Sequence, residues 1–131
     1  MPDAATTLAP GDAAAAAALA FLTEMSPDLR GGAILAGDGT VLAASDQPGR
    51  WREDAATLFE IADAAGAEPV EQVHIATEQG EVFALRAHGF AAVVVADRFA
   101  LASLLLFDMR ATLRDLALAG DGERAEGGER E

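Results

Sequence analysis

Few side chains in this 131-residue chain could carry out chemistry. There are two histidines, His74 and His88, and no cysteine, lysine or tyrosine. Without cysteine there are no thiolate metal sites or cysteine nucleophiles, and without lysine no Walker-A phosphate loop or Schiff base. A zinc site would need both histidines and a carboxylate. His74 alternates with apolar Val73 and Ile75 and His88 precedes a glycine, so we expect ordinary surface or edge histidines.

The serines and glycines also lack a catalytic context. Ser26, Ser45 and Ser103 do not lie in a nucleophile-elbow pattern. The glycines at 31–32 and 37–39 do not have dinucleotide-binding spacing, and they precede an expected strand instead of opening a helix. Hairpin geometry explains them. We therefore expect no enzyme, with no catalytic, cofactor-binding or metal-binding residues.

The charge of the chain argues against some classes of binding partner. The net charge is −13, and all nine basic residues are arginines, a composition typical of proteins from GC-rich bacterial genomes. The sequence contains no basic stripe that could bind nucleic acid, and its negative charge disfavours binding to an anionic membrane. The apolar run Ala13–Leu22 is too short to span a bilayer and follows acidic residues, so we expect a cytoplasmic protein without membrane insertion. The acidity favours a partner that offers Arg or Lys, or it serves solubility alone.

Hydrophobic periodicity predicts an α+β domain. We expect one five-stranded, mostly antiparallel sheet flanked by helices, in the order α-β-β-α-β-β-β-α. The first helix starts at Ala13 after an N-cap at Asp12. Later helices are expected at 53–65 and 98–118, the last with Asp97 as N-cap, and strands at 33–36, 40–45, 72–77, 81–86 and 90–96. The domain then spans 12–118, between a flexible arm at 1–11 and a disordered acidic tail at 119–131.

The expected helix at 53–65 has apolar residues on two sides. Leu58, Ile61, Ala62 and Ala65 form one stripe at helical spacing. Phe59 points about 100° away from Leu58. This helix therefore has apolar contacts to make in two directions.

A specific pattern lies between Arg30 and Ser45. It consists of two glycines, a short strand, the turn Gly37-Asp38-Gly39, and a second strand that ends in small residues. Two hairpinned strands, the apolar strand Phe90–Ala96 and a leucine-rich helix form the second part of the pattern. The chain resembles the roadblock (dynein light chain) family, which has a profilin-like fold, over roughly residues 12–118.

The resemblance implies a dimer, either of two identical chains or with a paralogous roadblock protein. Such proteins typically pair through the second helix and the third strand. The corresponding residues here are Leu58, Phe59, Ile61, Ala62, Ala65, Val73 and Ile75. Phe59 has an alternative position in the core of the monomer.

The resemblance also implies a function in signalling, because bacterial members often scaffold or regulate Ras-like small GTPases. Arg50, Trp51 and Arg52 lie in an expected loop and are candidate contacts for such a partner, although surface solvation also explains the arginines. The main alternative is a small-ligand sensory domain of PAS or profilin-like topology. That function would require a cavity between the sheet and a helix.

Overall fold

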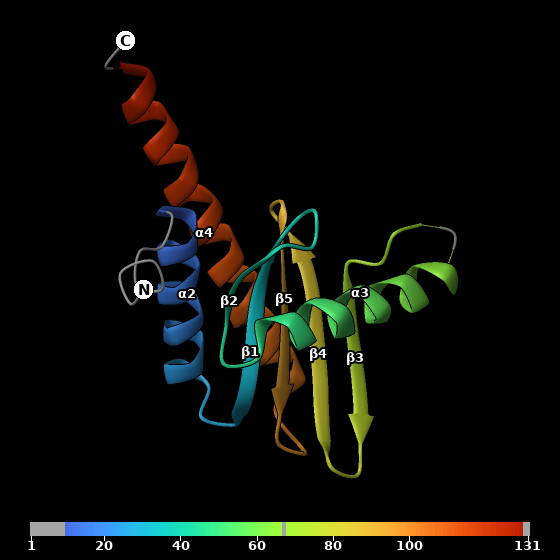
Figure 1. The fold of residues 1–131 in the computed structure, drawn as a ribbon. Helices are drawn as coiled ribbons and strands as arrows, with labels where there is room; N and C mark the ends of the chain where they lie inside the picture. The colour runs from blue at the N-terminus through green and yellow to red at the C-terminus, as the bar shows by residue number, and fades with distance from the viewer. Residues whose placement is uncertain (1–9, 67, 130–131) are drawn as a thin grey trace.

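The sheet and helices follow the order expected from the sequence (Figure 1). The computed structural model describes residues 10–66 and 68–129. Its elements are α2 (Pro10–Met25), β1 (Leu29–Ala36), β2 (Val41–Ala44), α3 (Pro48–Ala64), β3 (Gln72–Thr77), β4 (Gly80–Ala87), β5 (Phe90–Ala96) and α4 (Ala102–Glu129). The predicted α+β architecture is confirmed. Among the helices described, none is long and apolar enough to cross a membrane.

The five strands pair in the order β2-β1-β5-β4-β3, and every pair is antiparallel. The most apolar strand, β5, is central, as its near-continuous apolar run predicted. Short hairpin turns join β1 to β2, β3 to β4, and β4 to β5. Strands β2 and β3 are left at the two edges.

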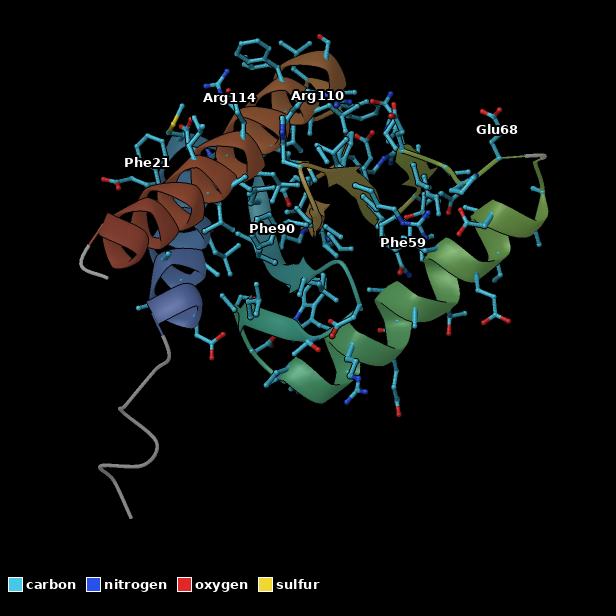
Figure 2. The ribbon with its side chains drawn as sticks, turned by 90° about the horizontal axis from the view of Figure 1, so that it is seen from above. Phe21, Phe59, Glu68, Phe90, Arg110 and Arg114 are labelled. Carbon is cyan, nitrogen blue, oxygen red and sulfur yellow. The ribbon has the colours of Figure 1, made fainter. Side chains whose placement is uncertain are left out.

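The helices cover the sheet unequally (Figure 2). Helices α2 and α4 pack together on one face, over a core that includes Leu22, Ile34, Phe83 and Met109. Helix α3 lies alone on the other face, where a smaller core includes Phe59 and Val93. The face under α3 is therefore the less completely covered of the two.

Gly32 allows α2 and β5 to approach β1 closely. A Cβ atom at this position would lie 2.9 Å from Cγ1 of Val94, 3.2 Å from the carbonyl oxygen of Val93 and 3.3 Å from Cδ1 of Leu19. Both glycines of the pair at 31–32 lie inside β1, which begins at Leu29 and not at Ala33 as expected, so the second glycine has a packing function within the strand.

We expect Gly32→Ala to lower the free energy of unfolding by about 1–3 kcal/mol, because the added methyl group overpacks a buried site. Urea denaturation followed by circular dichroism measures this change. Gly49→Ala is the control, since Gly49 lies in the first turn of α3 and nothing is within 4 Å of an added Cβ. Equal destabilisation by both substitutions would show that the close packing at Gly32 is unimportant.

Two helix starts differ from the sequence-based expectation. Helix α2 begins at Pro10, so Asp12 lies in its first turn and is not the N-cap. Proline is well tolerated at the start of a helix, where its missing N–H has no intrahelical partner. Helix α3 begins at Pro48 for the same reason, so Arg50, Trp51 and Arg52 are helical and not in a loop.

The last helix differs at both ends. It begins at Ala102, and Asp97 does not cap it, because Phe99 has a left-handed backbone with φ 66° and Asp97 pairs with Arg30. It continues to Glu129 instead of ending at Leu118. The segment expected to be a disordered tail contains Ala, Glu and Arg, which favour helix, and four glycines, which disfavour it. The flexible arm was expected over residues 1–11, but residues 10 and 11 belong to α2; its residues 1–9 lie outside the described residues.

Candidate protein-interaction site

Helix α3 extends beyond its own sheet. Its backbone contacts are mainly with β2 and β1. Figure 1 shows that its C-terminal turns pass in front of β4 and β3 and project beyond the edge of β3. The C-terminal end of α3 therefore reaches past β3, the edge strand of the sheet.

The apolar residues of α3 divide between these two environments. Phe59 is 7% exposed and lies between α3 and the sheet (Figure 2). It occupies the monomer core, which is the alternative that the sequence left open. Ile61 is 66% exposed, Ala65 is exposed, and Leu58 and Ala62 are half-buried. The stripe of Leu58, Ile61 and Ala65 thus remains available to a partner.

Strand β3 offers an apolar edge beside this stripe. In the described residues it pairs only with β4. Val73 and Ile75 lie opposite Ala84 and Val82, and Val73 packs against the smaller core under α3. Ile75 is 40% exposed. Both predicted strand residues therefore lie on the same face as α3.

A groove of about 410 Å³ separates α3 from the sheet on the side of the β3–β4 hairpin. Its apolar walls come from Trp51, Leu58, Ile75, Val82 and Val95. Its polar rim is formed by Asp46, Gln47, Arg50 and Asp54. The structure thus brings together residues of α3, β3, β4 and β5 around one mostly apolar depression.

The three candidate contact residues at the start of α3 point to different places. Trp51 is half-buried, and its Nε1–H donates to Oδ1 of Asp46 at 3.1 Å. Arg50 lies 3.7 Å from a carboxylate oxygen of Asp54, and both line the groove. Arg52 is exposed and faces a second cleft on the opposite side of α3. The three residues therefore do not form a single contact surface.

The second cleft has a volume of about 1060 Å³ and is open to solvent at the end of the sheet that carries the β1–β2 and β4–β5 turns. Buried Leu35, Ala55, Phe59 and Ala91 contribute apolar surface to it. The charged or titratable side chains come from Asp38, Arg52, Glu60, Asp63, Glu71, Arg86 and His88. The sequence did not indicate this cleft, because its lining residues come from distant parts of the chain.

Arg86 and Asp63 form a rigid wall of the second cleft. The guanidinium of Arg86 donates to both carboxylate oxygens of Asp63, at 2.8 and 2.9 Å, and to the carbonyl of Val70 at 3.1 Å. It also lies 4.0 Å above the ring of Phe59. These contacts fix the C-terminal part of α3 to β4 and hold α3 in its projecting position.

Asp63→Asn should lower the free energy of unfolding at neutral pH and flatten its dependence on pH in the acid range. Hydrogen bonds from Arg86 and from the backbone N–H of Val70 lower the pKa of Asp63 in the folded protein. Such a carboxylate contributes stability above its unfolded pKa, about 4, and the contribution disappears as pH falls through the folded pKa. Urea denaturation at a series of pH values from about 7 to about 3 measures both effects. Glu60→Gln, an exposed change on the same helix, should leave the profile nearly unaltered.

The two histidines lie apart from each other. His74 of β3 lies opposite Phe83 in the middle of β4, whereas His88 is exposed in the β4–β5 turn with φ 57°. In the part of the chain that the structure describes, no three His, Asp or Glu side chains are grouped so that they could hold a metal ion. His74 instead contacts Glu81.

Comparisons with known proteins identify the fold. No family model matches the chain, and the search of curated proteins gives no match. The structure is similar to a roadblock/LC7 domain from Streptomyces avermitilis, with 22% identity, a TM-score of 0.66, and coverage of 77% of this chain and 92% of that one. It is also similar to MglB from Myxococcus xanthus, with 10% identity, a TM-score of 0.66, and coverage of 89% and 95%.

Profilin IA from Acanthamoeba castellanii is a further similar structure. It has 16% identity and a TM-score of 0.54, covering 80% of this chain and 98% of profilin. The chain therefore has a roadblock-like fold with profilin-like topology, which confirms the resemblance stated from the sequence.

Proposed function

We propose that this chain is a non-enzymatic, dimeric interaction module whose copies pair through α3 and β3. One observation carries the proposal: α3 projects past the unpaired edge of β3 with Ile61 66% exposed. An exposed apolar helix face beside a free strand edge is an aggregation hazard unless something covers it. A second copy of the chain covers both at once.

The geometry of the proposed pair follows from the single-chain structure. A twofold axis perpendicular to the sheet, placed beside β3, would join two β3 strands antiparallel and form one continuous sheet. The projecting turns of each α3 would then lie over the sheet of the other copy. The partner's α3 would run antiparallel to α3, on the side where Leu58 and Ile75 line the groove of about 410 Å³.

The composition of this surface suits a second copy. Two chains that each carry −13 repel each other, so they can associate only where the contact surface is mostly apolar. Leu58, Ile61, Ala65 and Ile75 supply such a surface. We propose a homodimer. If the chain pairs instead with a paralogous roadblock protein, the pull-down described below would detect that protein.

We propose further that the dimer scaffolds or regulates a Ras-like small GTPase in a bacterial cytoplasm. The resemblance to the roadblock family and the structural similarity to MglB and MglC of Myxococcus xanthus support this function. The second cleft, of about 1060 Å³, lies on the side of α3 away from the proposed partner copy and stays open in the pair. Arg52 is exposed at this cleft and is the candidate contact.

The experiment is a pull-down from native extract with tagged protein, with a GTP analogue in one arm and GDP in the other. Mass spectrometry should find a small GTPase enriched in one nucleotide state. Arg52→Glu should weaken that enrichment while leaving the dimer intact, and Arg114→Glu, on the opposite face of the sheet, should not (Figure 2). Absence of a GTPase in both arms would overturn the GTPase proposal and leave the dimer proposal standing.

A ligand-sensing function is the second candidate, because the cleft of about 1060 Å³ lies between the sheet and α3, where that function requires a cavity. Native mass spectrometry of the purified protein separates the two functions. A small molecule that is retained, and released by Arg86→Ala, would favour ligand sensing.

A further inference from the structure

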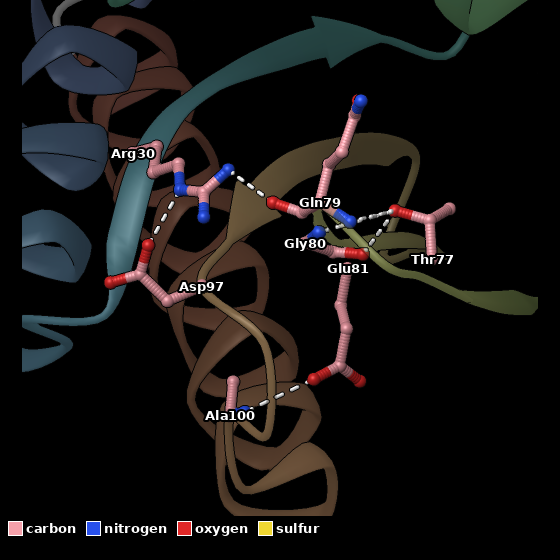
Figure 3. Close-up of polar contacts among 7 residues, drawn as sticks. All are labelled: Arg30, Thr77, Gln79, Gly80, Glu81, Asp97 and Ala100. Carbon is pink, nitrogen blue, oxygen red and sulfur yellow. Dashed lines mark hydrogen bonds and ion pairs between the residues drawn. The ribbon is translucent and has the colours of Figure 1, made fainter.

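A second polar network lies at the end of the sheet opposite the β1–β2 and β4–β5 turns. It joins the β3–β4 hairpin to the turn between β5 and α4 (Figure 3). Arg30 of β1 pairs with Asp97 and donates to the carbonyl of Gln79 at 2.6 Å. Thr77 accepts hydrogen bonds from the backbone of the hairpin. Glu81 reaches from β4 toward Ala100 (Figure 3).

Glu81 is the buried member of this network. The residue is 7% exposed, and its two carboxylate oxygens have different partners. Oε1 lies 2.5 Å from Nε2 of His74, and Oε2 accepts the backbone N–H of Ala100 at 3.1 Å. The Ala100 N–H also lies 3.3 Å from the carbonyl oxygen of Asp97. One carboxylate thus connects the edge strand β3 with the turn that precedes α4.

His74 is held in position for this contact. Its ring stacks on the ring of Phe83, with centroids 4.3 Å apart and an angle of 11° between the planes. Its side chain is 38% exposed at the edge of the sheet. Hydrogen bonding to His74 is the largest cause of the lowered pKa of Glu81. The position of His74 in the edge strand β3 therefore directly affects the buried carboxylate of Glu81.

The β5–α4 turn, which Glu81 contacts at Ala100, has an unusual backbone. Phe99 has φ 66°, a left-handed conformation that is strained for a bulky residue. Its side chain is 85% exposed, and Leu101 and Leu104 beside it are 64% and 54% exposed. Such a conformation persists only where surrounding contacts impose it.

We infer that Glu81 is a positioning residue that couples strand β3 to the β5–α4 turn, so that the hydrogen bond from His74 controls how firmly Phe99 is held outward. A buried carboxylate that loses its charged or donating partner is costly, and it relaxes by turning toward water. That movement would release the Ala100 N–H and allow Phe99 to leave the left-handed region. A change at the β3 edge thereby alters an apolar surface on the opposite side of the sheet from α3.

The other charged groups near Glu81 make contacts elsewhere, so His74 is its side-chain partner. Arg30 and Asp97 pair with each other, and the guanidinium of Arg98 lies 4.6 Å above the ring of Phe99. Within residues 10–66 and 68–129, His74 is the one side chain that bonds to the Glu81 carboxylate. The inference depends on these contacts within one chain and not on the proposed dimer or GTPase.

The test is amide hydrogen exchange of the full chain, measured by NMR at Ala100. His74→Phe keeps an aromatic ring over Phe83 and removes the hydrogen-bond donor. We expect exchange at Ala100 to become roughly tenfold faster, because the hydrogen bond lost involves a charged group. Exchange at Ala36, whose N–H donates to Thr40 at the far end of the sheet, should not change. Glu78→Gln, an exposed charge removal in the same hairpin, should leave Ala100 unaffected.

A second variant separates coupling from simple loss of structure. Phe99→Gly removes the strain of the left-handed backbone, since glycine adopts φ near 66° at little cost. Added to His74→Phe, it should slow exchange at Ala100 again, because the unstrained turn keeps the Ala100 N–H on its second acceptor, the carbonyl oxygen of Asp97. Unchanged exchange at Ala100 in His74→Phe would overturn the inference. So would an equal acceleration at Ala36, or failure of Phe99→Gly to restore protection.

Discussion

Ile61→Asp should convert the proposed dimer, of about twice 13.4 kDa, to a monomer of 13.4 kDa. Ile61 is 66% exposed on the projecting part of α3, so a charged side chain there is well solvated in the single chain. In the proposed dimer the same carboxylate would be buried without a partner, which costs several kcal/mol. Light scattering after size-exclusion chromatography measures the mass, and circular dichroism reports that the fold is retained.

The matched control is Phe107→Asp. Phe107 is 68% exposed on α4, on the opposite face of the sheet, so this substitution adds the same charge to an equally accessible position. This variant should remain a dimer. A folded dimer of Ile61→Asp would contradict the assignment of α3 to the interface, and a monomeric Phe107→Asp would move the interface to α4.

Phe59→Ala should lower the free energy of unfolding by about 3–5 kcal/mol. The side chain is 7% exposed, packs in the core under α3, and lies beneath the guanidinium of Arg86. Its removal leaves a cavity and also takes away the ring that contacts Arg86, which anchors α3 through Asp63. For a domain with a total stability of about 5–15 kcal/mol this is a large loss. Urea denaturation at one fixed protein concentration gives the value.

Phe107→Ala is the control for this second substitution, because it deletes the same ring from an exposed position. It should change the free energy of unfolding by less than about 0.5 kcal/mol. If Phe59→Ala instead dissolved the dimer and left the stability of the monomer unchanged, Phe59 would be an interface residue and not a core residue.

The sheet could be predicted well because its signals are local. Strand Phe90–Ala96 and strand Gln72–Thr77 have the bounds that periodicity and turn residues indicated. The hairpin around Asp38 was equally clear, and Asp38 accepts the N–H of Thr40 in the turn. Runs of apolar residues and Asp-Gly turns act over a few residues, so one sequence is enough to identify them.

The helix ends were harder to predict because tertiary contacts decide them. Asp97 is a good N-cap by residue type, but its pairing with Arg30, far away in the chain, holds the turn open until Ala102. The loop expected at residues 50–52 is part of α3, which starts at Pro48. Residue types that favour both a turn and a helix start do not separate these outcomes by themselves.

The candidate site was predictable only in part, for a similar reason. The stripe through Leu58, Ile61 and Ala65 follows from helical spacing; Ile61 and Ala65 are exposed, and Leu58 is half-buried. The pairs Arg86–Asp63 and His74–Glu81 depend on how β3, β4 and α3 come together in space. No local pattern in the sequence indicates such pairs.

The most direct test of the proposed dimer is the mass of the unaltered chain in solution over a series of dilutions. Light scattering should give about twice 13.4 kDa at micromolar concentrations and above, with dissociation only on strong dilution. A mass of 13.4 kDa at every concentration would contradict pairing through α3 and β3 and would leave the exposed stripe on α3 to a different partner.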